Sequence, residues 1–238
     1  MADRGDAAAR PEVLKLLKSM AAEPVQVAAI VALGKLGNSE DVTFFVAQFA
    51  NTSDSVKAAA RTSLTTLPGA ATPAAIAAAL KSATSELRVT LIEILATRRA
   101  LDTLPTLLQA AVDADARVRS AAMLALGQLA GPEQIAGMAA GVLKAEPGLE
   151  REAAEKALAL AAAREEDLQQ RAKPLLNYLE KATEADRLAL LPALGRLGGQ
   201  GALKLIQAEL ASTATPNHTA AVQALGNWPN GAVFPIVL

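Results

Sequence analysis

Residues 114–131 read ADARVRSAAMLALGQLAG, and two closely related segments occur elsewhere in the chain. Residues 24–38 read PVQVAAIVALGKLGN, and residues 184–199 read EADRLALLPALGRLGG. Self-similarity of this kind is the sequence signature of repeat architectures. The chain of 238 residues is therefore predicted to be an array of related units.

One leucine column defines the repeat along the whole chain. The leucines are spaced by 31, 31, 31, 32, 36 and 31 residues: Leu33, Leu64, Leu95, Leu126, Leu158, Leu194 and Leu225. The residue after each leucine is Gly, Ala or Thr, and the residue five positions before it is Ala or Thr. Three columns that stay in register are not chance hits in a leucine-rich chain.

The spacing of apolar residues within each copy predicts a helix. Apolar or small residues fill positions −8, −5, −4, −1, 0 and +3 relative to the leucine in most copies, which is a 3.6-residue period with a broad buried face. Gly, Pro or Asn then ends the helix, and a second apolar segment leads to the next copy. Because one such hairpin cannot bury its own apolar face, the hairpins must stack on one another.

We therefore expect an all-α fold, a right-handed α-α superhelix of about seven helical hairpins with the start of an eighth. The expected solenoid spans residues 11–238 and follows a flexible N-terminal tail, residues 1–10. The last residues, 230–238, carry no charge, although terminal repeats normally present a polar cap. We accordingly expect the chain to be an excerpt of a longer, multidomain polypeptide.

Two irregularities interrupt the repeat near its sixth copy. The step of 36 residues between Leu158 and Leu194 predicts a longer first helix over residues 161–181. Pro192 lies inside a predicted second helix, where proline costs about 3 kcal/mol unless the helix bends. We expect a local change of curvature there.

Residues 112–131, VDADARVRSAAMLALGQLAG, resemble the second helix of HEAT repeats, in particular the short bacterial repeats related to the bilin-lyase type. The resemblance extends over about residues 11–238. It implies a solenoid whose second helices form a concave surface. It implies no single function, since related solenoids serve as scaffolds, transport receptors, lyase subunits and DNA-repair enzymes.

A basic column is the most informative polar pattern. It lies seven residues before the leucine column and consists, after Gln26 in the first copy, of Lys57, Arg88, Arg119, Arg151, Arg187 and His218. This position is near the start of the second helix, where the helix dipole disfavours a cation. Some interaction must offset that cost in each copy.

Two interpretations of the basic column remain open, and they are not exclusive. In the first, a carboxylate from the preceding turn pairs with the cation. The candidate partners are Asp54, Asp113, Asp115, Glu86, Glu150, Glu184 and Asp186. The resemblance to HEAT repeats implies a ladder of Asp and Arg between neighbouring repeats, a spacing that Asp113 and Arg119 match. In the second, the column lines the concave surface and binds an acidic partner.

Catalytic chemistry finds little support in the composition. The chain has a single histidine, His218, and no cysteine, so we expect no metal site, no catalytic residues and no cofactor. With 23 basic and 24 acidic residues, the charge balance disfavours nucleic acid as a partner. No segment reaches the run of roughly 18 apolar residues that a membrane span requires.

The sequence thus favours a non-catalytic scaffold that binds a protein or an extended peptide, as a monomer or as part of a larger chain. The alternatives are a nucleic-acid-binding solenoid of the repair-glycosylase type, which would use the basic column, and a lyase or chaperone-like subunit. The compartment stays open: we expect a soluble protein, extracytoplasmic if its parent carries a signal peptide.

Overall fold

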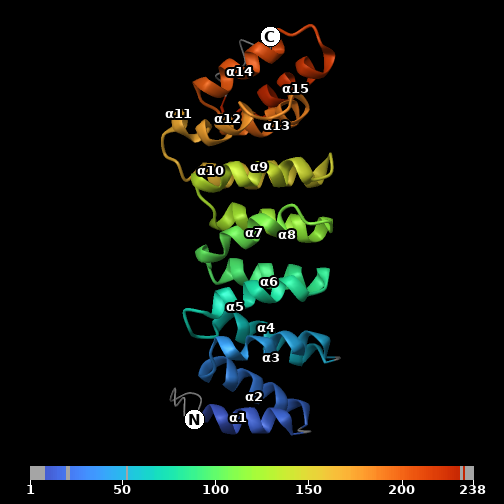
Figure 1. Cartoon of the computed structure of the whole chain (residues 1–238), viewed down its shortest axis with the longest axis vertical. Helices are drawn as coiled ribbons and strands as arrows, with labels where there is room; N and C mark the ends of the chain where they lie inside the picture. Colours follow the sequence, from blue (N-terminus) through green and yellow to red (C-terminus); the bar gives the residue numbers. More distant parts are fainter. Residues whose placement is uncertain (1–8, 20–21, 52, 231–232, 234–238) are drawn as a thin grey trace. The chain divides into compact units, whose positions relative to one another are not determined.

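The computed structural model describes residues 9–19, 22–51, 53–230 and 233. These residues form α-helices joined by turns and short 3₁₀ segments, without any β-strand. The chain divides into two compact units, Met1–Thr103 and Leu104–Leu238. Each unit is built of antiparallel helix pairs that lie in successive layers (Figure 1).

The first unit contains three pairs, and in each pair the two helices pack against one another. They are α1 (Arg10–Lys18) with α2 (Glu23–Leu36), α3 (Val42–Ala47) with α4 (Asp54–Thr66), and α5 (Thr72–Ala79) with α6 (Ser85–Thr97).

The second unit contains four pairs and one additional short helix, α11 (Leu168–Arg171). The pairs are α7 (Leu104–Ala110) with α8 (Ala116–Leu129), α9 (Ile135–Lys144) with α10 (Leu149–Ala162), α12 (Lys173–Leu179) with α13 (Glu184–Leu197), and α14 (Gln200–Leu210) with α15 (Thr215–Gly226). The all-α fold of about seven hairpins is therefore confirmed for the described part of the chain. The expected start of an eighth lies almost wholly outside the described residues.

The leucine column forms the centre of the core. Its first six members are fully buried, and Leu225 is 4% exposed. The column four residues earlier is buried in every copy, from Ala29 to Ala221. The sequence predicts that position −5 also belongs to the buried face. This prediction holds only in part, because Ala28 and Ala153 are exposed.

Small residues after the leucine let successive second helices approach closely. A Cβ at Gly195 of α13 would collide with the backbone carbonyl of Ala224 in α15 and would lie 2.7 Å from its carbon. In the first unit, a Cβ at Gly34 of α2 would lie 2.6 Å from the Cβ of Ser63 in α4. The glycines are therefore required by the close contact between second helices, and not by the turn that follows.

Side-chain caps fix where several second helices begin. Ser53, Thr84 and Thr183 each accept a hydrogen bond from the backbone N–H three residues later, and Asp115 accepts one from Arg117. Such caps satisfy N–H groups that have no partner within the helix.

The irregular sixth copy differs from the expectation. Instead of one longer first helix, the extra residues form α11, separated by Ala172 from α12, which has Pro174 in its first turn. Proline suits a first helical turn because its missing N–H has no helical partner there. Helix α13 continues through Pro192.

The expected tail, residues 1–10, lies outside the described residues up to residue 8. Arg10 belongs to α1, and its Nη2 donates to Oδ1 of Asp41 at 2.8 Å. Asp41 is 4% exposed, so this ion pair joins α1 to the turn before α3. The last residue of the expected tail is therefore part of a helix.

Candidate functional site

Arg119 is the most buried member of the basic column. Its Nε and Nη2 donate to the two carboxylate oxygens of Glu150 at 2.7 and 2.9 Å. Its Nη1 donates to the backbone carbonyls of Asp113 and Ala114 at 3.0 and 2.9 Å. These bonds join α8 to the start of α10 and occupy nearly all guanidinium donors.

The pairing shifts the protonation equilibria of both side chains. The hydrogen bond from Arg119 holds the pKa of Glu150 below its ordinary value, and the same bond raises the pKa of Arg119 against the effect of burial. A bidentate pair between an arginine and a carboxylate is among the stronger hydrogen-bonded pairs in proteins. Arg119 therefore holds two repeats together.

Arg187 forms an ion pair with the next helix in the same unit, but its buried Nε makes no hydrogen bond. Its Nε lies 3.3 Å from Oε1 of Glu209 in α14, and the other oxygen of Glu209 accepts from Nδ2 of Asn217 in α15 at 2.6 Å. His218, the last member of the column, is exposed, whereas the preceding Asn217 is buried. In the last pair, the linking position has thus moved by one residue.

Arg151 is bound differently from Arg119. Its Nε and Nη2 both donate to the carbonyl of Ala145, at 3.2 and 2.8 Å. Its Nη1 has no hydrogen-bond partner among the described residues. Arg151 is therefore fixed in place by its own turn while part of its guanidinium remains open.

The two members in the first unit contact their own helices. Lys57 lies 3.3 Å from Asp54 in an exposed pair, and Arg88 donates to Oγ of Ser85 at 3.2 Å. An exposed ion pair such as that of Lys57 and Asp54 contributes little to stability.

Of the aspartates expected as ladder partners, Asp54 pairs with Lys57, whereas Asp113 and Asp115 mainly shape the turn before α8. Asp113 accepts from the backbone N–H of Asp115, which in turn caps α8 and pairs with the side chain of Arg117 at 2.9 Å. The carboxylate that binds Arg119 comes instead from the following repeat.

Two arginines outside the basic column stabilise helix ends, and sequence analysis did not single them out. In the first unit, Arg98 donates to the carbonyls of Leu64, Thr65 and Leu67 at the end of α4, and burial lowers its pKa. In the second, Arg164 donates to the carbonyls of Gly127, Gln128 and Ala130 at the end of α8.

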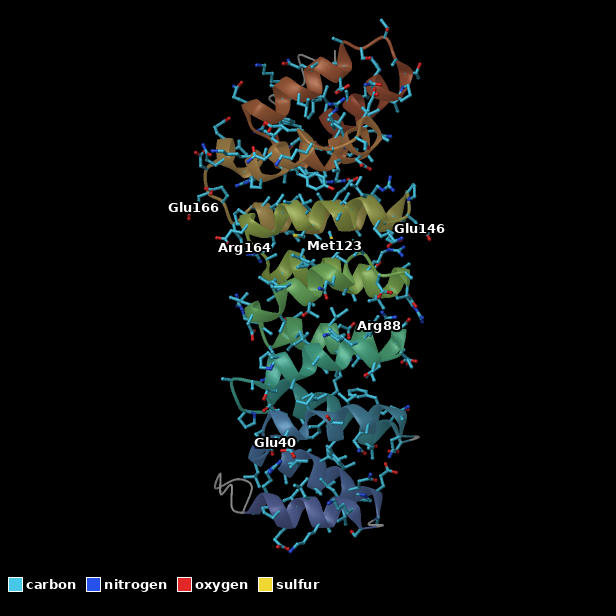
Figure 2. The ribbon with its side chains drawn as sticks, viewed as in Figure 1. Glu40, Arg88, Met123, Glu146, Arg164 and Glu166 are labelled. Atoms are coloured by element: carbon cyan, nitrogen blue, oxygen red, sulfur yellow. The ribbon has the colours of Figure 1, made fainter. Side chains whose placement is uncertain are left out.

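In the second unit, the contacts of Arg119 and those of Arg164 lie at opposite ends of the helices. Glu146 is near the guanidinium of Arg119, with 4.0 Å between Oε1 and Nη2. Figure 2 shows Glu146 at one end of this layer and Arg164 at the other. The carbonyls that end a helix have no helical donor, which is why an arginine from the next repeat is useful there.

An apolar pocket lies between α8 and α10. Its volume is about 380 Å³, and Met123, Leu124, Ala157 and Leu160 contribute to its wall. Leu124 and Leu160 are each 59% exposed. Arg119 and Glu150 also line it, so their ion pair borders the apolar pocket.

A polar pocket of about 610 Å³ lies among α10, α13 and α15. Arg151, Glu152, Glu155, Arg196 and Asn227 line it. Glu155 is 5% exposed and accepts a hydrogen bond from Nε of Arg196 at 3.2 Å. Burial raises the pKa of Glu155, although the bond from Arg196 works in the opposite direction.

No group of metal-binding side chains is found in the described part of the chain. In the same residues, no helix is both long and apolar enough to cross a membrane.

Stacked hairpins with buried leucines and linking arginines define an α-solenoid repeat protein. Residues 72–159 match the family described as HEAT repeats, so this part of the chain is similar to HEAT repeats. HEAT repeats generally serve as scaffolds for protein interaction and are typically not enzymes.

Other comparisons add little. The crystal structure of an engineered protein is 18% identical, with a match that covers 92% of this chain and 95% of that chain at a TM-score of 0.31. No curated protein matches the chain.

Proposed function

We propose that the chain is a non-catalytic scaffold that binds a protein or an extended peptide through the exposed surface of its second helices. The observation that carries this proposal is the apolar pocket between α8 and α10. Two large leucines, Leu124 and Leu160, are exposed at a hollow whose lining is mostly apolar. Exposed apolar surface at a hollow is typical of binding sites.

The glycosylase-type and lyase or chaperone-like alternatives gain no comparable support. The chain has 23 basic and 24 acidic residues, and this near-zero charge disfavours a phosphate backbone as the ligand. An interaction scaffold therefore remains the function that the geometry favours.

The proposal can be tested by affinity capture with the full chain and extract of the source cells. The variant Leu124→Glu/Leu160→Glu places charges at the apolar pocket, and Leu149→Glu is the matched control. Leu149 is 86% exposed in the same unit and does not line this pocket. Circular dichroism should show unchanged helicity for both variants.

We expect a protein that the wild type and Leu149→Glu retain and that the double variant loses, with a pocket-dependent complex reconstituted from the purified proteins. Recovery of the same proteins by all three forms would contradict the proposal. So would the absence of any protein specific to the wild type.

A further inference from the structure

Two arginines line the polar pocket among α10, α13 and α15, and hydrogen bonds hold part of each guanidinium group in place. Arg151 is held through Nε and Nη2 by the carbonyl of Ala145, and Arg196 is held through Nε by Glu155. Nη1 of each arginine forms no hydrogen bond among the described residues. Both arginines line the pocket.

The carboxylates in this pocket already have cationic partners. Glu152 accepts from Nζ of Lys156 at 2.7 Å and lies 3.9 Å from Nη2 of Arg196. Glu155 is buried against Arg196. Glu152 is thus paired with Lys156 and Glu155 with Arg196, whereas Arg151 forms no ion pair among the described residues. Planar guanidinium donors suit carboxylate oxygens particularly well.

The pocket also offers groups that complement a peptide backbone. Pro192 has no N–H, so the carbonyl of Leu188 lacks the donor that an uninterrupted helix would supply, and both residues line the pocket. Nδ2 of Asn227 donates to the carbonyl of Pro192 at 3.3 Å and has a second hydrogen to offer. An acceptor and a donor thus lie beside the two arginines.

We propose that this pocket binds an acidic peptide segment of the partner, with a side-chain carboxylate between Arg151 and Arg196 and backbone groups near Leu188 and Asn227. This inference rests on the proposed scaffold function and names the chemistry of its partner. Arg119 is not available for the same role, because nearly all of its donors are already used.

A fluorescein-labelled hexaglutamate peptide is the probe, and fluorescence anisotropy with the full chain at low salt is the measurement. A hexaglutamine peptide and a short DNA duplex serve as comparison ligands. The central variant is Arg151→Gln. Its matched control is Arg171→Gln, because Arg171 likewise donates through Nε and Nη2 to one carbonyl, that of Glu165, but does not line the pocket.

We expect hexaglutamate to bind the wild type, and Arg151→Gln to weaken binding by about tenfold, the effect of losing one charged hydrogen bond. Arg171→Gln should bind as the wild type does. Because Arg196→Gln leaves Glu155 buried without its partner, Glu155→Gln/Arg196→Gln is the second variant. It should also weaken binding.

The proposal is overturned if the wild type does not bind hexaglutamate, or if hexaglutamine binds equally well. An equal loss in Arg171→Gln would show a diffuse effect of charge, and duplex binding that depends on Arg151 in place of peptide binding would identify a phosphate site. None of these results affects capture through Leu124 and Leu160, so failure here is distinct from failure of the scaffold function.

Discussion

Two neighbouring interfaces in the second unit use the same column position in opposite ways. At the interface between α8 and α10, which we call the sealed interface, Arg119 donates hydrogen bonds to Glu150 and to two backbone carbonyls. At the interface between α10 and α13, which we call the open interface, Arg151 binds only the carbonyl of its own turn, and a polar pocket remains. Repeated sequence therefore does not imply repeated function: the role of each arginine depends on whether the next repeat supplies a carboxylate.

The largest expected effect is a difference in stability between the alanine variants of these two arginines. Arg119→Ala leaves Glu150 partly buried without its partner, and we expect it to lower the free energy of unfolding by about 3–5 kcal/mol. Arg151→Ala removes bonds to one carbonyl and should cost about 1 kcal/mol. Urea denaturation followed by circular dichroism measures both. Equal losses would abolish the distinction between a sealed and an open interface.

Protonation should disturb the sealed interface less than deletion does, because a neutral carboxyl group still forms hydrogen bonds. The pKa of Glu150 is lowered by folding, so its contribution to stability is complete above the ordinary glutamate pKa of about 4.3 and is lost as the pH falls through the lower, folded value. Glu150→Gln should remove this acid dependence from the melting temperature.

The open interface should show the opposite sign. Burial raises the pKa of Glu155, so stability is lost as the pH rises from the ordinary glutamate pKa through the raised, folded value. Melting curves of Glu155→Gln across this range should lack that loss. Parallel pH profiles for Glu150→Gln and Glu155→Gln would refute the assignment of opposite roles to the two carboxylates.

A third interface, between α13 and α15, differs from both because the two helices contact each other through their backbones at Gly195 and Ala224. Gly195→Ala should force the two helices apart and cost about 1–3 kcal/mol. Gly226→Ala occupies the same column, but a Cβ there meets no described atom within 4 Å. The second variant should melt at or slightly above the wild-type temperature, because alanine favours helix. A similar loss in both would argue against close packing as the reason for Gly195.

A small effect is expected at the end of α8. Arg164→Ala removes an exposed side chain that donates to three carbonyls at the end of α8 and to that of Leu160, and we expect a loss of about 1 kcal/mol. Hydrogen exchange should increase locally, in the last turn of α8. Arg164→Lys should rescue part of the protection, since a lysine keeps the charge but not the fork of donors.

The local consequences of the repeat were predictable. The leucine column, the alternation of helices and the small residue beside each leucine all follow from sequence periodicity, and the buried column from Leu33 to Leu225 agrees with it. Periodicity also located the cations near the starts of the second helices.

Partnerships between repeats were not predictable in the same way. Glu150 is 31 residues from Arg119 in the sequence, and Glu209 reaches Arg187 from a first helix. The caps formed by Arg98 and Arg164 lie at different offsets in their copies, so no column marks them. Each partnership depends on how far a long side chain extends across the gap to the next layer.

The sequence by itself determined that this chain forms stacked helical hairpins, because the 3.6-residue spacing of apolar side chains allows no other burial of its leucines. Tertiary structure alone decided which arginines are consumed by the stack and which remain open. The physical reason is that a guanidinium group is satisfied by whichever oxygen lies within hydrogen-bond distance, and only packing brings that oxygen near.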